Sequence, residues 1–181
     1  MKKLEIDEMG RMDCEEFKSS VKLPVKVILD NVRSLYNVGS VFRTSDAFRI
    51  DEIILCGITA TPENSLVEIH KTALGAEETV RWRYEKDCLQ VVRELVSSGF
   101  QVIAVEQVRD SIKLEQFVAE KDMKYAFVFG NEVKGVSQQV VDECCTALEI
   151  PQFGTKHSLN VSVSAGIVIW EMTKQLEELL D

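Results

Sequence analysis

The sequence has few of the residues with which proteins build metal sites and disulfide frameworks. Its 181 residues include only two histidines, and none of its five cysteines forms a Cys-x-x-Cys pair or lies near a histidine. Common zinc sites need such spacings, and small disulfide scaffolds are richer in cysteine. We therefore expect no metal, no disulfide framework, and reduced thiols in the cytoplasm.

Long hydrophobic runs are also absent. Residues 1–7 are charged and lack the apolar core of a secretion signal. No stretch approaches the roughly 20 apolar residues that cross a bilayer. We expect a cytoplasmic protein with no membrane partner. The length and the 45% hydrophobic content suit one compact domain with a real core.

Positive charge is scarce, with 21 lysines and arginines against 30 aspartates and glutamates, a net charge of -9. This balance argues against broad, nonspecific binding of nucleic acid, which needs a basic surface. A local basic patch stays open, because several basic residues gather in the middle of the chain. They are Arg33, Arg43, Arg49, Lys71, Arg81, Arg83 and Lys86.

Short apolar runs alternate with helical patterns after a polar extension over residues 1–22. The runs cover residues 25–29, 52–55, 101–105 and 125–129, with weaker ones at 147–150 and 80–84. Helices are predicted over residues 37–48, 87–97, 137–145 and 162–180. The runs show little polar alternation, as in parallel strands covered on both faces. The pattern predicts one α/β domain over residues 23–181 with a parallel sheet.

Three polar loops follow predicted strands, where parallel sheets usually bind ligands. In the first loop, Asn37 is predicted to cap a helix, and Arg43 can grip a phosphate through its fixed fork of donors. The second loop, residues 129–137, has two glycines that permit close approach of a ligand. In the third, residues 150–166, Ser158 and Asn160 either cap the final helix or form a polar site. Both interpretations stay open at this point.

Motifs of other enzyme classes are missing from these loops. None has the glycine spacing of a dinucleotide-binding turn or a P-loop. This absence disfavours a flavodoxin-like or Rossmann-type redox protein and a nucleotide triphosphatase. No nucleophile elbow is present, and adjacent residues such as His157 and Ser158 rarely have the geometry of a base and its nucleophile.

Taken in order, the three loops resemble the signature motifs of the SpoU (TrmH-type) family, the RNA 2′-O-ribose methyltransferase branch of the SPOUT superfamily. The matching segments are Asn37-x-Gly39-x-x-x-Arg43-Thr44, Gly130-x-Glu132-x-x-Gly135, and Ile150-Pro151 through Gly154 with Ser158-Leu159-Asn160-Val161-Ser162. The resemblance covers residues 25–172. It implies a parallel-sheet α/β/α domain with a deep trefoil knot in its C-terminal part. Two positions depart from the second motif, Val133 where glycine is frequent and Val136 where leucine is frequent.

The resemblance also implies a cofactor and a set of site residues. The cofactor is S-adenosyl-L-methionine, held by Gly130, Ile150 and Leu159. The implied catalytic residues are Asn37, Arg43, Glu132, Ser158 and Asn160. Arg43 is placed at the ribose hydroxyl, but a guanidinium with a pKa above about 12 is a poor base. It can instead stabilise the developing alkoxide or hold the adjacent phosphate. Asn37 and Ser158 are expected to orient Arg43 and that phosphate, and Glu132 and Asn160 to shape the site.

The implied partners are RNA and a second copy of the chain. We expect tRNA in preference to rRNA as the substrate. Homodimers of the family pack partly through the last helix, whose stripe of Ile169, Met172, Leu176 and Leu179 or Leu180 faces either a partner or the core. The alternative function is a noncatalytic RNA-binding module that keeps the knotted fold. Such a module should have lost some of the five polar residues, and all five are present.

Overall fold

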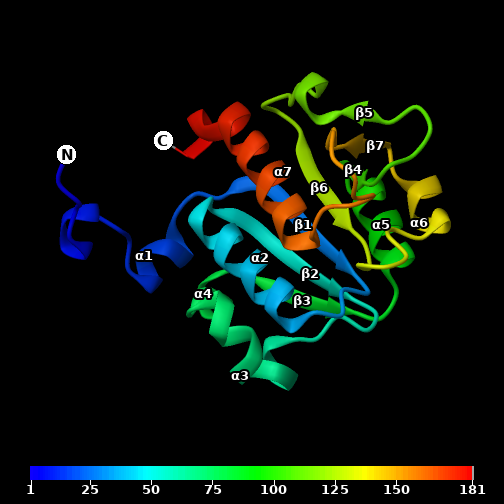
Figure 1. Ribbon diagram of the computed structural model, residues 1–181. Helices are drawn as coiled ribbons and strands as arrows, with labels where there is room; N and C mark the ends of the chain where they lie inside the picture. Colours follow the sequence, from blue (N-terminus) through cyan, green and yellow to red (C-terminus); the bar gives the residue numbers. More distant parts are fainter. Residues whose placement is uncertain (181) are drawn as a thin grey trace.

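The protein is a three-layer α/β/α structure around a parallel sheet of seven strands (Figure 1). The computed structural model describes residues 1–180, except the side chains of residues 6 and 7. The strand order is β3-β2-β1-β6-β4-β7-β5, and every pairing of strands is parallel. The α/β class and the parallel sheet expected from the sequence are confirmed.

All six predicted strands occur, and a seventh short one was missed. The strands are β1 Leu23–Asp30, β2 Ile50–Cys56, β3 Trp82–Glu85, β4 Phe100–Val105, β5 Ile112–Lys113, β6 Lys124–Phe129 and β7 Thr146–Glu149. The missed strand, β5, has only two residues, and both are exposed. It therefore leaves no hydrophobic pattern in the sequence.

The helices agree with the prediction less closely. They are α1 Cys14–Ser19, α2 Leu35–Ala47, α3 Pro62–Ala73, α4 Ala76–Thr79, α5 Cys88–Ser97, α6 Gln138–Glu143 and α7 Val161–Leu176, with 3-10 turns η1 Ile6–Met9, η2 Leu114–Gln116 and η3 Glu177–Leu180. The pair α3 and α4 was not predicted. On α3, Leu66 and Val67 are exposed while Ile69 is buried, so its apolar residues form no clear helical stripe.

One expectation about helix caps needs correction, and one question left open about the last helix is answered. Asn37 does not cap α2, because the helix begins at Leu35 and the Ser34 hydroxyl accepts the backbone N–H of Asn37 at 3.3 Å. Ser158 does not cap α7. That cap is Asn160, whose side-chain oxygen accepts the N–H groups of Ser162 and Val163 at 2.9 and 3.4 Å. The side chain of Asn37 is therefore free for tertiary contacts.

Two hydrophobic cores lie on the two faces of the sheet. The larger one packs α2, α3 and α7 against one face, and the smaller one packs α5 and α6 against the other. On α7, Ile169, Met172 and Leu176 are fully buried in the larger core. Burial of such side chains is worth about 1.5–3 kcal/mol each. The apolar stripe of the last helix therefore belongs to the intramolecular core.

The connection between β4 and β6 wraps around β7. The sheet order places β7 between β4 and β5, so the chain passes beyond β7 to form β5 and then returns to β6. On its return it lies against the end of α7, where the Gln175 side chain accepts the N–H of Ala119 at 2.7 Å and donates to the carbonyl of Phe117 at 3.0 Å. Because β7 is parallel to the other strands, residues 150–160, which follow it, lie at the same edge of the sheet as the loops after β1, β4 and β6.

Candidate active site

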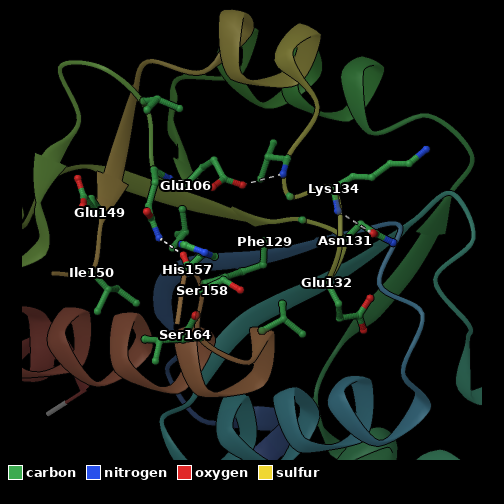
Figure 2. Close-up of a pocket in the computed structure, with 18 of the residues that line it drawn as sticks. Glu106, Phe129, Asn131, Glu132, Lys134, Glu149, Ile150, His157, Ser158 and Ser164 are labelled. Carbon is green, nitrogen blue, oxygen red and sulfur yellow. Dashed lines mark hydrogen bonds between the residues drawn. The ribbon is translucent and has the colours of Figure 1, made fainter. Parts of the chain in front are cut away.

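A pocket of about 420 Å³ opens at the carboxyl ends of β4, β6 and β7 (Figure 2). This volume suits a small-molecule site, and the carboxyl edge of a parallel sheet is where such sites usually form. Gly130, Ile150 and Leu159, the three residues expected to hold the cofactor, all line it. The structure thus brings together residues from the second and third loops that are 20 or more positions apart in the sequence.

The second loop is a tight backbone turn that only glycine permits. Asn131 and Gly135 exchange two backbone hydrogen bonds, of 3.2 and 2.8 Å, which close the turn. A Cβ atom on Gly130 would lie 2.2 Å from the Gly135 carbonyl carbon and the Val136 nitrogen. Gly135 itself has φ +66°, a conformation that favours glycine. The two glycines of the motif therefore set the shape of this pocket wall.

The side-chain amide of Asn131 completes the attachment of this loop. The Asn131 side-chain oxygen accepts the N–H groups of Val133 and Lys134 at 2.9 and 3.1 Å. Its amide nitrogen donates to the carbonyl of Asn31, after β1, at 2.8 Å. Asn131 thus holds the turn and fastens it to the end of the neighbouring strand.

Three of the predicted polar residues form one hydrogen-bonded chain. The Asn37 side-chain nitrogen donates to Glu132 at 3.2 Å, and the Asn160 nitrogen donates to the Asn37 oxygen at 3.1 Å. The Ser162 hydroxyl lies 2.7 Å from the Asn160 oxygen and 3.5 Å from the Asn37 oxygen. One residue from each of the three loops thus meets in a single network beside the pocket.

Glu132 also anchors the first loop. Its two oxygens accept the backbone N–H groups of Arg33 and Ser34 at 3.1 and 3.0 Å, in addition to the Asn37 amide. Partial burial alone would raise the pKa of this carboxyl, but the hydrogen bonds outweigh burial, and the pKa lies below its ordinary value. Glu132 is therefore ionised at neutral pH, with its oxygens occupied by donors.

Arg43 and Ser158 lie outside this network. Arg43 is exposed on α2, six residues beyond Asn37, and makes no hydrogen bond or ion pair with the residues that the structure describes. Ser158 is exposed and lines the pocket. The Asn37 side chain bonds to Glu132 and Asn160, and among the described residues no hydrogen bond joins Arg43 to Asn37 or Ser158. The part that each residue plays in catalysis stays a prediction.

Residues at the end of β4 were missed from the sequence. Glu106 and Gln107 line the pocket, and neither belongs to the three motifs. One signal was available, since a polar pair directly follows a predicted buried strand. Strand order was needed to see that this strand lies beside β6 and β7.

Two residues of the central basic group have partners within the chain. Arg81 pairs with Asp51 at 2.7 Å, and Arg49 donates to the carbonyl of Leu180 at 3.1 Å.

Over the described residues, no group of three or more His, Cys, Asp or Glu side chains has the arrangement of a metal site. Within residues 1–180, no helix is both long and apolar enough to span a membrane.

The chain is similar to known RNA-modifying proteins along most of its length. It is 32% identical over 157 residues to the 23S rRNA (guanosine-2′-O-)-methyltransferase RlmB of Neisseria meningitidis, covering 84% of this chain and 59% of that protein. It is 31% identical to the protein of the same name from Shewanella oneidensis, of which it covers 66%. The chain thus spans about three fifths to two thirds of these curated relatives.

Solved structures give the same picture. The A. aeolicus TrmH/SpoU tRNA modifying enzyme superposes with a TM-score of 0.77 at 27% identity, covering 91% of this chain and 81% of that chain. The AdoMet-bound rRNA methyltransferase from Sinorhizobium meliloti superposes with a TM-score of 0.76 at 27% identity, covering 87% and 61%. These neighbours have the SPOUT knot fold, so the expected α/β knot is confirmed. The model of the SpoU rRNA Methylase family matches residues 24–170, and the chain is a member of that family.

Proposed function

We propose that this protein is an S-adenosylmethionine-dependent methyltransferase that modifies the ribose 2′-hydroxyl of RNA. One observation supports this most directly. The donor-sized pocket between the second and third loops adjoins the Asn37–Glu132–Asn160 network, which ties the first loop to both. The names of the Neisseria relative and the Sinorhizobium structure agree with this chemistry and this cofactor.

The pocket suits the proposed cofactor. Gly130 lacks a side chain where the turn closes, so the backbone of the second loop forms the wall and offers its polar groups to an adenine. Ile150 and Leu159 supply apolar contact on the other wall. Bound there, S-adenosylmethionine supplies a methyl group that is already activated by its sulfonium.

The protein's own contribution is then alignment and charge. Holding the two reactants in line removes much of the barrier to a displacement. Glu132 is a poor proton acceptor, because its pKa is lowered and three donors occupy its oxygens. We assign it to holding the first loop. Arg43, a permanent cation, would stabilise the developing alkoxide or hold the adjacent phosphate.

Free basic side chains near the site support RNA as the substrate despite the acidic composition. Arg33, Arg43 and Lys134 come from the first and second loops, are exposed, and form no ion pair with described residues. Arg81, Arg83 and Arg93 are exposed or half-buried but are paired with carboxylates. Unpaired cations are the ones available to phosphates.

We favour tRNA over rRNA and a cytoplasmic location. The similar A. aeolicus structure is a tRNA modifying enzyme, and this chain covers 81% of it, against 59% of the rRNA-modifying Neisseria relative. The five cysteines are free, which agrees with a reducing compartment.

We further propose a homodimer formed through α7 and the third loop. With the inner stripe of α7 in the core, its outer face leaves Val163, Ile167 and Trp170 exposed, and Phe153 of the third loop is 97% exposed. Apolar side chains gathered on one surface mark an interaction site.

The methyltransferase domain is taken as residues 23–181 after the extension 1–22, although residue 181 lies outside the described part of the chain.

Methyl transfer tests the main proposal. Purified protein is incubated with unmodified total tRNA or rRNA and labelled S-adenosylmethionine, and nuclease digestion with mass spectrometry maps the product. We expect label at a ribose 2′-oxygen and a loss of about 100-fold or more in Arg43→Ala. Arg93→Ala, on the opposite face of the sheet, is the matched control. Normal transfer by Arg43→Ala would remove Arg43 from the mechanism. Binding of donor and RNA without transfer would favour the noncatalytic module.

A further inference from the structure

The end of β4 lies in none of the three motifs but contacts the loops of two of them. Glu106 Oε2 accepts the backbone N–H of Val136, in the second loop, at 3.0 Å. The next residue, Gln107, donates from its side chain to the carbonyl of His157, in the third loop, at 2.8 Å. Dashed lines beside Glu106 and His157 in Figure 2 mark these two bonds. Two consecutive residues thus reach both walls of the pocket.

We propose that Glu106 and Gln107 act as a clasp, a pair of positioning residues that hold the second and third loops together and thereby set the affinity for S-adenosylmethionine. This inference rests on the proposed function, because it assigns the pocket to that donor. If the two loops that form the pocket walls were independent, both would have to become ordered when the ligand binds, and this ordering would cost free energy. A clasp lowers that ordering cost in advance and so increases affinity.

The carboxylate of Glu106 is fixed by its surroundings. Its Oε1 accepts the backbone N–H of Gln107 at 2.8 Å, and its Oε2 is used by Val136. A Cβ atom on Gly135 would lie 2.1 Å from Oε2, so the carboxylate fills the space that the glycine leaves open. Glu106 therefore provides the hydrogen-bond acceptor, and Gly135, which has no side chain, leaves the space that the carboxylate occupies.

The clasp is built on a rigid part of the sheet. Glu106 donates its backbone N–H to the carbonyl of Leu148 in β7 at 3.0 Å, which continues the β4–β7 ladder past the end of β4. The third loop, by contrast, has no helix or strand between β7 and α7. Groups held by a sheet position a site more accurately than groups held by loops alone. The hydrogen bond from Gln107 thus fixes the third loop at His157 relative to the sheet.

The clasp is separate from the network that involves the first loop. Glu106 and Gln107 bond to the second and third loops, whereas Glu132 bonds to Arg33, Ser34 and Asn37. Loss of the clasp should therefore weaken donor binding and raise the donor KM while kcat at saturating donor changes little. A merely structural residue would instead lower the thermal stability and the active fraction, with an unchanged donor Kd in the folded protein.

Isothermal titration calorimetry with S-adenosylmethionine tests this on the full-length chain. Glu106→Ala removes the bond to Val136 together with the local bond to the Gln107 N–H, and Gln107→Leu removes the bond to His157. Glu115→Ala, exposed on η2 and outside the pocket, is the control. We expect about a 10-fold rise in Kd for each clasp variant, the size of one lost hydrogen bond of this kind, and none for the control. Glu106→Gln keeps one oxygen acceptor and should give a smaller rise. This variant also serves if the alanine variant unfolds.

Hydrogen exchange of the free protein supplies an independent readout. Glu106→Ala should speed exchange near Val136, and Gln107→Leu should speed it in the segment around His157. Clasp variants that bind the donor as the wild type does would overturn the clasp and leave the proposed methyl transfer in place. A wild-type protein that binds no S-adenosylmethionine would overturn the proposed function, and the role of the clasp in donor affinity with it.

Discussion

Gly130→Ala should damage the donor pocket while the rest of the fold stays intact. The added methyl group would lie 2.2 Å from backbone atoms of Gly135 and Val136, where ordinary contact begins near 3.4 Å. These atoms are main chain, so no flexible side chain can swing aside. The two sides of the turn must separate by about 1.2 Å. That movement breaks both backbone hydrogen bonds between Asn131 and Gly135, now 3.2 and 2.8 Å long.

The cost follows from those two bonds. Each backbone hydrogen bond contributes about 0.5–1.5 kcal/mol net, so the closed turn loses about 1–3 kcal/mol. At 1.4 kcal/mol for each tenfold change, the Kd for S-adenosylmethionine should rise by about 5- to 150-fold. Calorimetry gives the Kd, and circular dichroism checks that the fold is kept, with a melting temperature lower by about 2–12 °C. Gly154→Ala is the control, because no atom lies within 4 Å of a Cβ built there. Wild-type affinity in Gly130→Ala would refute this account of the turn.

Three further predictions concern charge and assembly. Glu132→Gln should lower the free energy of unfolding by about 1 kcal/mol at pH 7, a value discounted for solvent exposure. The pKa of Glu132 is lowered in the folded state, so its stabilisation is complete above the ordinary value of 4.5 and is lost as the pH falls through the folded pKa. The gap between variant and wild type in urea titrations should therefore close in acid. Burial raises the pKa of Asp30, and hydrogen bonds from Asn31 and Cys88 offset this only in part. The folded state thus binds more protons, and stability falls as the pH rises from 3.8 through the folded pKa. Asp30→Asn should melt at a higher temperature than the wild type at pH 7, and an equal or lower melting temperature would contradict this. Trp170→Glu should give a monomer by light scattering, whereas a wild type that is already monomeric would remove the proposed dimer.

Much of the fold was predictable because its signals are local. The runs that form β1, β2, β4 and β6 are mostly apolar and show little polar alternation, since helices cover both faces of the sheet. The order of the strands was not predictable in the same way. Nothing in residues 146–149 indicates that β7 inserts between β4 and β5. The residue pattern of a strand that is paired on both sides is the same whichever strands lie beside it. The resemblance implied a C-terminal knot, and the strand order came from the structure.

Asn37 shows the limit of local interpretation within the site. Both serine and asparagine are favoured helix caps, and residue type alone does not decide between Ser34 and Asn37. The choice is made by Glu132, which lies 95 positions away and draws the Asn37 side chain out of any capping role. The same contact joins residues from two different motifs, and each of the two side chains needs a hydrogen-bonding partner of a particular type.

Glu106 and Gln107 were missed for the opposite reason. Their partners are the N–H of Val136 and the carbonyl of His157, and every residue except proline offers both groups. A side chain that bonds to main chain therefore demands no particular residue type at the other end of the bond. The polar residues of the three motifs coincide with the Asn37–Glu132–Asn160 network, and the motifs leave out the end of β4. If the clasp sets donor affinity, residues outside the motifs contribute to the affinity of this site. Such residues are identified from the side chains that bond to the backbone of each motif loop.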